Sequence, residues 1–268
     1  MAPPVIPAGL EDPRLDDYRH VGDPAWLLAR GWFVAEGRLV VERLVADRRH
    51  RVHSLLLSEA AARAMVRTVD AVAPDTAVYV TPQKAMNAVV GFNIHRGCLA
   101  LAERPAAAAL DSLPLATASA VVVAEGVNNP DNIGGLFRNA AALGAAGLVL
   151  GPDCGDPLYR KAIRTSMAAT LRVPWAPAGA WPDALETLRR AGLAIVAATP
   201  APGTVSLYEA DLPSRAAVLV GAEGPGLSEA ALAKADLRVG IPMHAGMDSL
   251  NVATAAAVIL AALAARRG

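Results

Sequence analysis

Short runs of purely apolar residues alternate with helix-like segments through the second half of this 268-residue chain. The first run, residues 120–124, reads AVVVA and has no polar position, as expected for a strand that is covered on both faces. Strands that alternate with helices usually form a parallel sheet with helices on both faces. The pattern therefore predicts an α/β domain with strands at 120–124, 148–150, 194–198, 217–220 and 237–241, and helices at 132–143, 157–169, 182–191, 228–235 and 249–265.

The first half of the chain also mixes both kinds of element, with less regularity. We expect helices at 24–30, 33–45 and 58–72, the last capped by Ser58, and strands at 52–57, 78–80 and 98–102. A stretch rich in Pro and Ala with almost no charge, residues 104–117, is typical of a linker. The predicted organisation is a small α/β domain at 1–103, a linker at 104–117 and a second domain at 118–268.

Composition limits the compartment and the classes of partner. The longest apolar stretch, residues 250–265, is interrupted by Asn251 and Thr254 and is too short for a membrane span. No secretory signal is visible, and the two cysteines match no metal or redox spacing. We therefore expect a cytoplasmic protein that binds neither a membrane nor a metal.

The charge balance gives no general sign of nucleic-acid binding, because 25 basic and 25 acidic residues cancel. Basic residues are nevertheless concentrated in two places, between Arg38 and Arg67 and between Arg160 and Arg172. Clusters of this kind are more often solvated faces than binding sites. An interaction with RNA would have to depend on such local patches.

Three loops that follow predicted strands hold the residues suited to chemistry, where ligands of parallel sheets usually bind. The first, residues 128–140, has Asn132 at a helix start, Gly134 and Gly135 inside the helix, and Arg138 further along. Each glycine costs a helix about 1 kcal/mol relative to alanine, which suggests that another segment packs closely there. A capped turn with a surface arginine is the simpler interpretation.

The second loop, residues 220–228, contains Gly221, Glu223 and two further glycines. Glycines after a strand let the backbone approach a ligand, although a plain tight turn is about equally compatible with this pattern. The spacing is not that of a dinucleotide-binding fingerprint, and no phosphate-binding P-loop is present. A nicotinamide-dependent oxidoreductase is therefore disfavoured.

The third loop runs from Ile241 to the start of the last predicted helix. Ser249 is placed to cap that helix, and its free backbone amides could hold a carboxylate or carbonyl group. Capping does not account for Asn251, which the prediction places inside a helix that asparagine disfavours.

Taken in order, the three loops closely resemble the three motifs of the SpoU–TrmH family, RNA 2′-O-methyltransferases of the SPOUT class. The resemblance covers residues 120–264 and extends to 156–167, where DPLYRKAIRTSM is similar to the region between the first two motifs. It implies a deep trefoil knot, a homodimer, and an S-adenosylmethionine pocket lined by Gly221, Ile241 and Leu250. The first half resembles, more weakly, the small L30e-like RNA-binding domain that precedes the knot in several members.

The resemblance also implies roles for five side chains. Arg138 would activate a ribose 2′-hydroxyl in ribosomal or transfer RNA, either as a base or by stabilising the developing negative charge. Asn132 and Glu223 would orient Arg138 or the substrate, and Ser249 and Asn251 would complete the site around the ribose. Two alternatives stay open: an RNA-binding knotted paralogue without catalysis, and methylation of a base.

Overall fold

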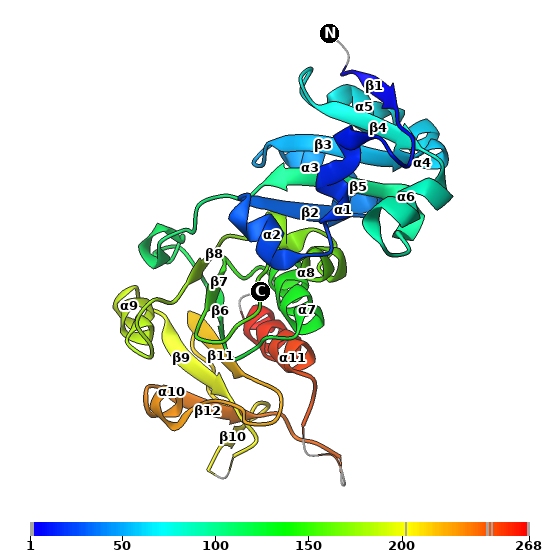
Figure 1. Ribbon diagram of the computed structural model, residues 1–268. Coiled ribbons are helices and arrows are strands. Elements are labelled where there is room, and N and C mark those ends of the chain that lie inside the picture. Colours follow the sequence, from blue (N-terminus) through cyan, green and yellow to red (C-terminus); the bar gives the residue numbers. More distant parts are fainter. Residues whose placement is uncertain (1–2, 202, 245–246, 248, 267–268) are drawn as a thin grey trace. The chain divides into compact units, whose positions relative to one another are not determined.

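The computed structural model describes residues 3–201, 203–244, 247 and 249–266. The chain divides into two compact units, which Figure 1 shows in sequence colours. The first unit comprises Met1–Ala106 together with Leu158–Leu171, and the second comprises Ala107–Pro157 together with Arg172–Gly268. No helix among the described residues is long and apolar enough to cross a membrane.

The second unit is built on a seven-stranded sheet in the order β10-β12-β9-β11-β6-β7-β8, and every pairing in it is parallel. All six residues of β6 are buried, as the continuous apolar run predicts for the first five, Ala120–Ala124. The five predicted strands of this half are confirmed, whereas β8 and β10 are short strands that the pattern does not reveal. The strands are β6 (Ala120–Glu125), β7 (Leu148–Leu150), β8 (Trp175–Pro177), β9 (Ala194–Ala198), β10 (Val205–Ser206), β11 (Ala216–Gly221) and β12 (Leu237–Gly240).

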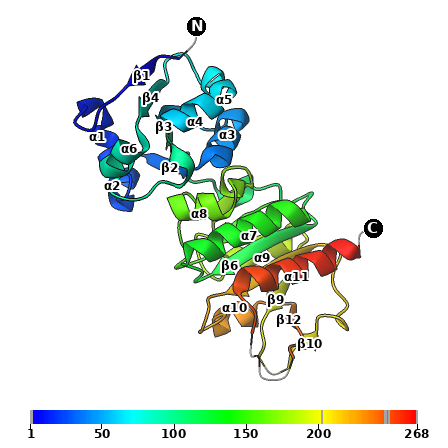
Figure 2. The same cartoon turned by 90° about the vertical axis from the view of Figure 1, so that its right-hand side faces the viewer.

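Helices cover both faces of this sheet. In Figures 1 and 2, α7 and α11 lie against one face, and α9 and α10 lie on the other. Val121 and Val123 of β6 point into the core cluster that contains Leu185 and Leu188 of α9. The parallel α/β sheet expected from the sequence is therefore present. The helices are η3 (Leu110–Ser112), α7 (Pro130–Leu143), α9 (Ala184–Arg190), α10 (Glu229–Ala233) and α11 (Val252–Ala265).

The close packing expected at the glycines of α7 occurs where this helix meets α11. A Cβ atom built on Gly135 would lie 2.7 Å from the Cβ of Ala253. Asn139, one turn further along α7, donates a hydrogen bond from Nδ2 to the carbonyl oxygen of Ala253 at 2.7 Å. Gly135 therefore lets two helices approach, and their contact fixes the start of α11.

The first unit contains a mixed five-stranded sheet in the order β1-β4-β3-β5-β2. Strands β1, β4 and β3 pair in parallel, whereas β5 runs antiparallel to both β3 and β2. Its elements are β1 (Val5–Pro7), η1 (Pro13–Leu15), α1 (Asp16–Arg19), α2 (Pro24–Ala29), β2 (Trp32–Glu36), α3 (Arg38–Asp47), β3 (Val52–Ser58), α4 (Glu59–Ala64), α5 (Val66–Ala71), β4 (Ala77–Thr81), α6 (Gln83–Val90), η2 (His95–Gly97), β5 (Cys98–Glu103), α8 (Arg160–Thr165) and η4 (Ala169–Leu171).

The prediction of a helix at 33–45 is wrong for its first residues. Residues Trp32–Glu36 form β2, which pairs with β5, and the helix begins only after Gly37, whose φ is 96°. Pairing with a neighbouring strand outweighs the local helical spacing of the apolar residues. The helix predicted at 58–72 is two helices, α4 and α5, interrupted at Met65, although Ser58 caps its start as expected by accepting from the Ala61 amide at 3.2 Å.

The segment Leu158–Leu171 follows β7 in the sequence but packs within the first unit. Glu36, at the end of β2, is fully buried and accepts hydrogen bonds from Arg160 and Arg164. Arg43 donates to the carbonyl oxygen of Met167 at 2.5 Å, and the Arg160 guanidinium lies 4.1 Å from the centre of the Phe92 ring. These basic residues therefore make structural contacts within the first unit and do not simply form a solvated face.

Replacing Glu36 by alanine is expected to destabilise the folded protein by about 2–3 kcal/mol. Removing one partner of a buried ion pair costs about 3–5 kcal/mol, and we expect less here because Arg160 and Arg164 keep side-chain exposures of 21% and 42%. Urea unfolding would measure the loss. The matched control is Glu103→Ala, because Glu103 is 48% exposed and its pair with Arg51 should contribute less than about 1 kcal/mol. Equal unfolding midpoints for the two variants would contradict the prediction.

Candidate functional site

A cavity of about 620 Å³ lies at the carboxyl ends of β9, β11 and β12. Ligands of open parallel sheets bind at this edge, and the volume is within the range of small-molecule sites. Glu223 is the one charged side chain among the described residues that line it. The lining residues are Ala198, Thr199, Pro200, Val220, Gly221, Ala222, Glu223, Gly224, Gly226, Val239, Ile241, Met243, Ser249, Leu250, Asn251, Val252 and Ala255.

The glycine-rich loop forms one wall of the cavity as a closed turn. Ala222 and Gly226 form a bridge, with the Gly226 amide donating to the Ala222 carbonyl at 3.1 Å. A Cβ atom on Gly221 would lie 2.3 Å from the carbonyl carbon of Gly226, so no larger residue fits there without a backbone shift. Gly224 and Gly226 have φ values of +91° and +73°, a conformation that side chains rarely adopt. The loop therefore presents backbone to the cavity.

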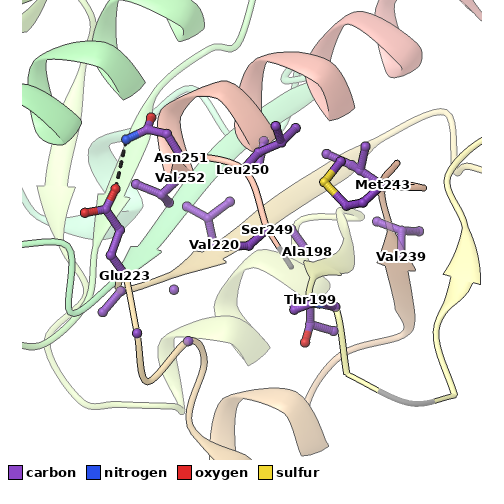
Figure 3. Close-up of a pocket in the computed structure, with 17 residues that line it drawn as sticks. Ala198, Thr199, Val220, Glu223, Val239, Met243, Ser249, Leu250, Asn251 and Val252 are labelled. Carbon is purple, nitrogen blue, oxygen red and sulfur yellow. Dashed lines mark hydrogen bonds between the residues drawn. The ribbon is translucent and has the colours of Figure 1, made fainter. Parts of the chain in front are cut away.

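The three residues predicted to line a cofactor pocket, Gly221, Ile241 and Leu250, all line this cavity. They come from the end of β11, from the residue after β12, and from the segment before α11. Figure 3 shows Glu223 and Asn251 at one end of the cavity and Met243 and Val239 at the other. Residues that are distant in the sequence thus surround one volume.

Three of the five predicted catalytic side chains form a hydrogen-bonded group beside the cavity. Asn251 donates from Nδ2 to Oδ1 of Asn132 at 2.7 Å and to Oε1 of Glu223 at 2.9 Å. Asn132 is 6% exposed, whereas Glu223 and Asn251 lie at the surface. The dashed line in Figure 3 marks the contact between Asn251 and Glu223. The structure therefore joins one residue from each of the three predicted loops.

The prediction that Ser249 caps the last helix is wrong, because Asn251 occupies that position. Helix α11 begins at Val252, and Oδ1 of Asn251 accepts from the amides of Ala253 at 3.0 Å and Thr254 at 3.3 Å. Asn251 is thus a preferred cap residue outside the helix, not a disfavoured residue inside it. Ser249 is exposed and lines the cavity.

The first loop differs from the prediction in a similar way. Helix α7 begins at Pro130, and Asn129 caps it by accepting from the Asp131 amide at 2.9 Å. Asn132 therefore lies in the first turn of the helix, with its side chain directed to Asn251. Its amide group is available for this contact because it does not cap its own helix.

Arg138 lies apart from the hydrogen-bonded group. It follows Asn132 by six residues on α7, which corresponds to about 9 Å along the helix axis. Its side chain is exposed, does not line the cavity, and makes no hydrogen bond or ion pair with the residues that the structure describes. The structure thus leaves this guanidinium available for an external anion.

Glu125, which the sequence analysis did not single out, anchors the glycine-rich loop. It is 8% exposed at the end of β6 and accepts hydrogen bonds from Trp181 Nε1 at 2.7 Å, Ser228 N at 2.9 Å and Ser228 Oγ at 2.7 Å. An acidic residue that directly follows an apolar strand is the signal that could have identified it. The sequence analysis also does not identify Ala198, at the end of β9, as a residue that lines the cavity. Its place at the carboxyl edge of the sheet is nevertheless predictable.

The ionisable side chains near the first loop do not form a nucleophile or a metal centre. Burial raises the pKa of the Cys154 thiol, and its Sγ lies 3.3 Å from the carbonyl oxygen of Ala124. Cys154 is therefore protonated at neutral pH and is a poor nucleophile. Within the described ranges, no group of three or more His, Cys, Asp or Glu residues could hold a metal ion.

Comparison with known proteins relates this fold and this cavity to one family. The SpoU rRNA Methylase family matches residues 119–261. An uncharacterized tRNA/rRNA methyltransferase of Mycobacterium bovis is 42% identical over 255 residues, covering 92% of this chain and 87% of that protein.

Two solved structures extend the similarity to nearly the whole chain. A TrmH-family protein from Porphyromonas gingivalis is 25% identical, with a TM-score of 0.81 over 97% of this chain and 100% of that chain. The SpoU methyltransferase AviRb from Streptomyces viridochromogenes is 25% identical, with a TM-score of 0.78 over 95% and 97%. The family match over more than half of the chain and the relative that is 42% identical show that this protein belongs to the SpoU methylase family.

Proposed function

We propose that this protein transfers a methyl group from S-adenosylmethionine to a ribose 2′-hydroxyl in ribosomal or transfer RNA. The observation that carries the proposal is the hydrogen-bonded group of Asn132, Asn251 and Glu223 beside the cavity lined by Gly221, Ile241 and Leu250. Membership of the SpoU family supports methyl transfer to RNA. The motif resemblance supports the ribose as the acceptor.

The residues that line the cavity suit the cofactor. Gly221 leaves the wall free of a side chain, and apolar residues such as Ile241 and Leu250 suit the body of a nucleoside. No Lys or Arg is found among the described lining residues, whereas the Glu223 carboxylate suits a cationic ligand. A nicotinamide dinucleotide, with its negatively charged pyrophosphate, would fit this lining less well.

The cofactor would supply a methyl group bonded to a positively charged sulfur, and its transfer to the ribose oxygen leaves a neutral thioether and frees the hydroxyl proton. The chain's own contribution is to position and activate the hydroxyl. Asn251 is held by Asn132 and Glu223, so its amide is fixed beside the cavity. Such pre-organised polar groups position a substrate without further loss of entropy.

Arg138 would bind a phosphate next to the target ribose and stabilise the negative charge that develops on the 2′-oxygen. Arginine remains protonated in proteins, and its planar group of donors matches phosphate geometry. A phosphate oxygen or a water molecule would then accept the hydroxyl proton. A literal base role for Arg138 is the alternative, and Ser249, exposed at the cavity, would contact the ribose in either case.

The knot, the homodimer, the L30e-like first domain and its boundaries, and the cytoplasmic location follow from the sequence and the family resemblance, and they stay predictions. Among the described residues Arg138 makes no hydrogen bond or ion pair, so its guanidinium is also available to a second copy of the chain. Analytical ultracentrifugation of the purified protein would measure the oligomeric state.

Titration calorimetry with S-adenosylmethionine, followed by transfer of a tritiated methyl group to total ribosomal and transfer RNA, tests the proposed function. We expect binding at one site per chain and label that is recovered as a 2′-O-methylnucleoside after nuclease digestion. If the label is recovered on a base, the methyl acceptor is a base and not the ribose. Binding without transfer to any RNA would favour the non-catalytic paralogue, and the absence of binding would contradict the proposal as a whole.

A further inference from the structure

Aromatic side chains are scarce in this protein, yet several gather at one surface of the first unit. The chain has four tryptophans and five histidines, and two of each form a continuous series of ring contacts. We name this series the aromatic stripe, and its members are His20, Trp26, Trp32 and His53. The ring centroids are 5.0 Å apart for His20 and Trp26, 5.9 Å for Trp26 and Trp32, and 4.5 Å for Trp32 and His53.

Three different elements and the residue that follows α1, His20, bring these rings together. Trp26 is on α2, which contacts the edge strand β2 that carries Trp32 (Figure 1). His53 lies in β3 where the register with β5 shifts between Val52 and Ser54. Such a bulge inserts an unpaired residue and redirects its side chain. The irregularity in β3 thus places His53 against Trp32.

The tryptophans of the stripe also have a structural role, since both are half-buried and pack against the core of the first unit. The two ends of the stripe have no such role. His20 is exposed, the His53 side chain is 46% exposed, and each stacks on a tryptophan with interplanar angles of 21° and 28°. The series therefore begins and ends with a flat ring that is open to solvent.

A cation accompanies the rings. The Arg30 guanidinium lies 4.8 Å from the Trp26 ring centre and 5.7 Å from that of Trp32, with 53% of its side chain exposed. Asp17 lies 3.8 Å from Arg30 Nη1 and 4.0 Å from His53 Nε2, and so helps to hold both groups at this surface. Flat rings interleaved with an exposed guanidinium are the chemistry that binds a base and its phosphate.

We propose that the aromatic stripe binds an unpaired segment of the RNA substrate, with a base stacked on an end of the ring series and its phosphate at Arg30. This inference rests on the proposed function for its choice of RNA over another polymer. Bases in an RNA duplex are already stacked on one another, and the deep major groove hides their edges from side chains. A base can therefore reach these rings only from a loop, a bulge or a single strand.

Fluorescence anisotropy with a labelled, unpaired oligoribonucleotide of about ten nucleotides, a length that a single binding fold can cover, tests the proposal. His53→Ala should weaken binding about tenfold, the effect expected from the loss of one stacking surface, and Arg30→Ala should have a similar effect. His53→Phe should restore binding, because phenylalanine keeps a flat ring without the imidazole nitrogens. Lys84→Ala, which removes an exposed charge of the first unit outside both basic clusters, should bind like the wild type.

A fully base-paired RNA stem serves as one reference ligand, and S-adenosylmethionine serves as the other. The stem should bind wild type and His53→Ala equally, and the affinity for the cofactor should not change in any variant. Three results would overturn the proposal. His53→Ala could lose as much affinity for the stem as for the unpaired RNA, His53→Phe could fail to restore binding, or the wild type could fail to bind unpaired RNA. If the wild type methylates RNA while His53→Ala leaves KM unchanged, the stripe proposal fails and the proposed function stands. If the wild type methylates no RNA but His53→Ala still binds RNA tenfold more weakly, the proposed function fails and the stripe proposal stands.

Discussion

Arg138→Ala is expected to lower kcat/KM for RNA methylation at least about 100-fold while the affinity for S-adenosylmethionine stays unchanged. The guanidinium is exposed on α7 and lies outside the cofactor cavity, so its removal takes no contact from that ligand. It also makes no hydrogen bond or ion pair with the described part of its own chain, so the fold should depend little on it. Transfer of a tritiated methyl group to RNA under single-turnover conditions would measure the loss.

A lysine at position 138 separates the two possible roles of the arginine. If the residue stabilises charge, Arg138→Lys should keep a substantial part of the activity, although it binds phosphate more weakly. The activity of this variant should then depend little on pH near neutrality. If it acts as a base, the lysine variant should gain activity steeply with pH, because an amine gives up its proton far more readily than a guanidinium. Arg190→Ala, at an exposed position on α9, is the control for the loss of a surface charge. Full activity in Arg138→Ala would exclude both roles.

The parallel sheet of the second unit was predictable because its strands are buried on both faces. A strand such as β6 then has no polar position before its last residue, and an unbroken apolar run is a stronger signal than alternation. The ends of such strands define the edge where a ligand binds, so the loops after β6, β11 and β12 could be identified without any structure. The cavity extends the same edge to the end of β9.

The parts that were not predictable depend on contacts between distant residues. The apolar residues after Trp32 have helical spacing, and only pairing with β5 makes them a strand. Asn251 was placed inside a helix because its capping bonds and its contact with Asn132 depend on where α11 begins against α7. The place of Glu125 after an apolar run marks it in the sequence, but its role as an anchor of the glycine-rich loop becomes clear only from its bonds to Trp181 and Ser228.

Gly221→Ala is expected to weaken S-adenosylmethionine binding about tenfold to a hundredfold. The added Cβ would lie 2.3 Å from the carbonyl carbon and 2.4 Å from the carbonyl oxygen of Gly226, and 2.5 Å from the Leu227 amide nitrogen. All three are backbone atoms, so the loop has to open, at a cost of about 1–3 kcal/mol that is typical of overpacking. If the cofactor binds only the closed loop, this cost appears directly as lost affinity.

Titration calorimetry measures that affinity, and thermal unfolding of the same sample shows that the variant is folded. Gly9→Ala is the matched control, because a Cβ at Gly9 would meet no atom within 4 Å. The φ of Gly221 is outside the left-handed region, so alanine brings no backbone strain of its own and the effect is steric. A folded Gly221→Ala variant that binds the cofactor as tightly as the wild type would mean that this loop does not form the wall of the cofactor site.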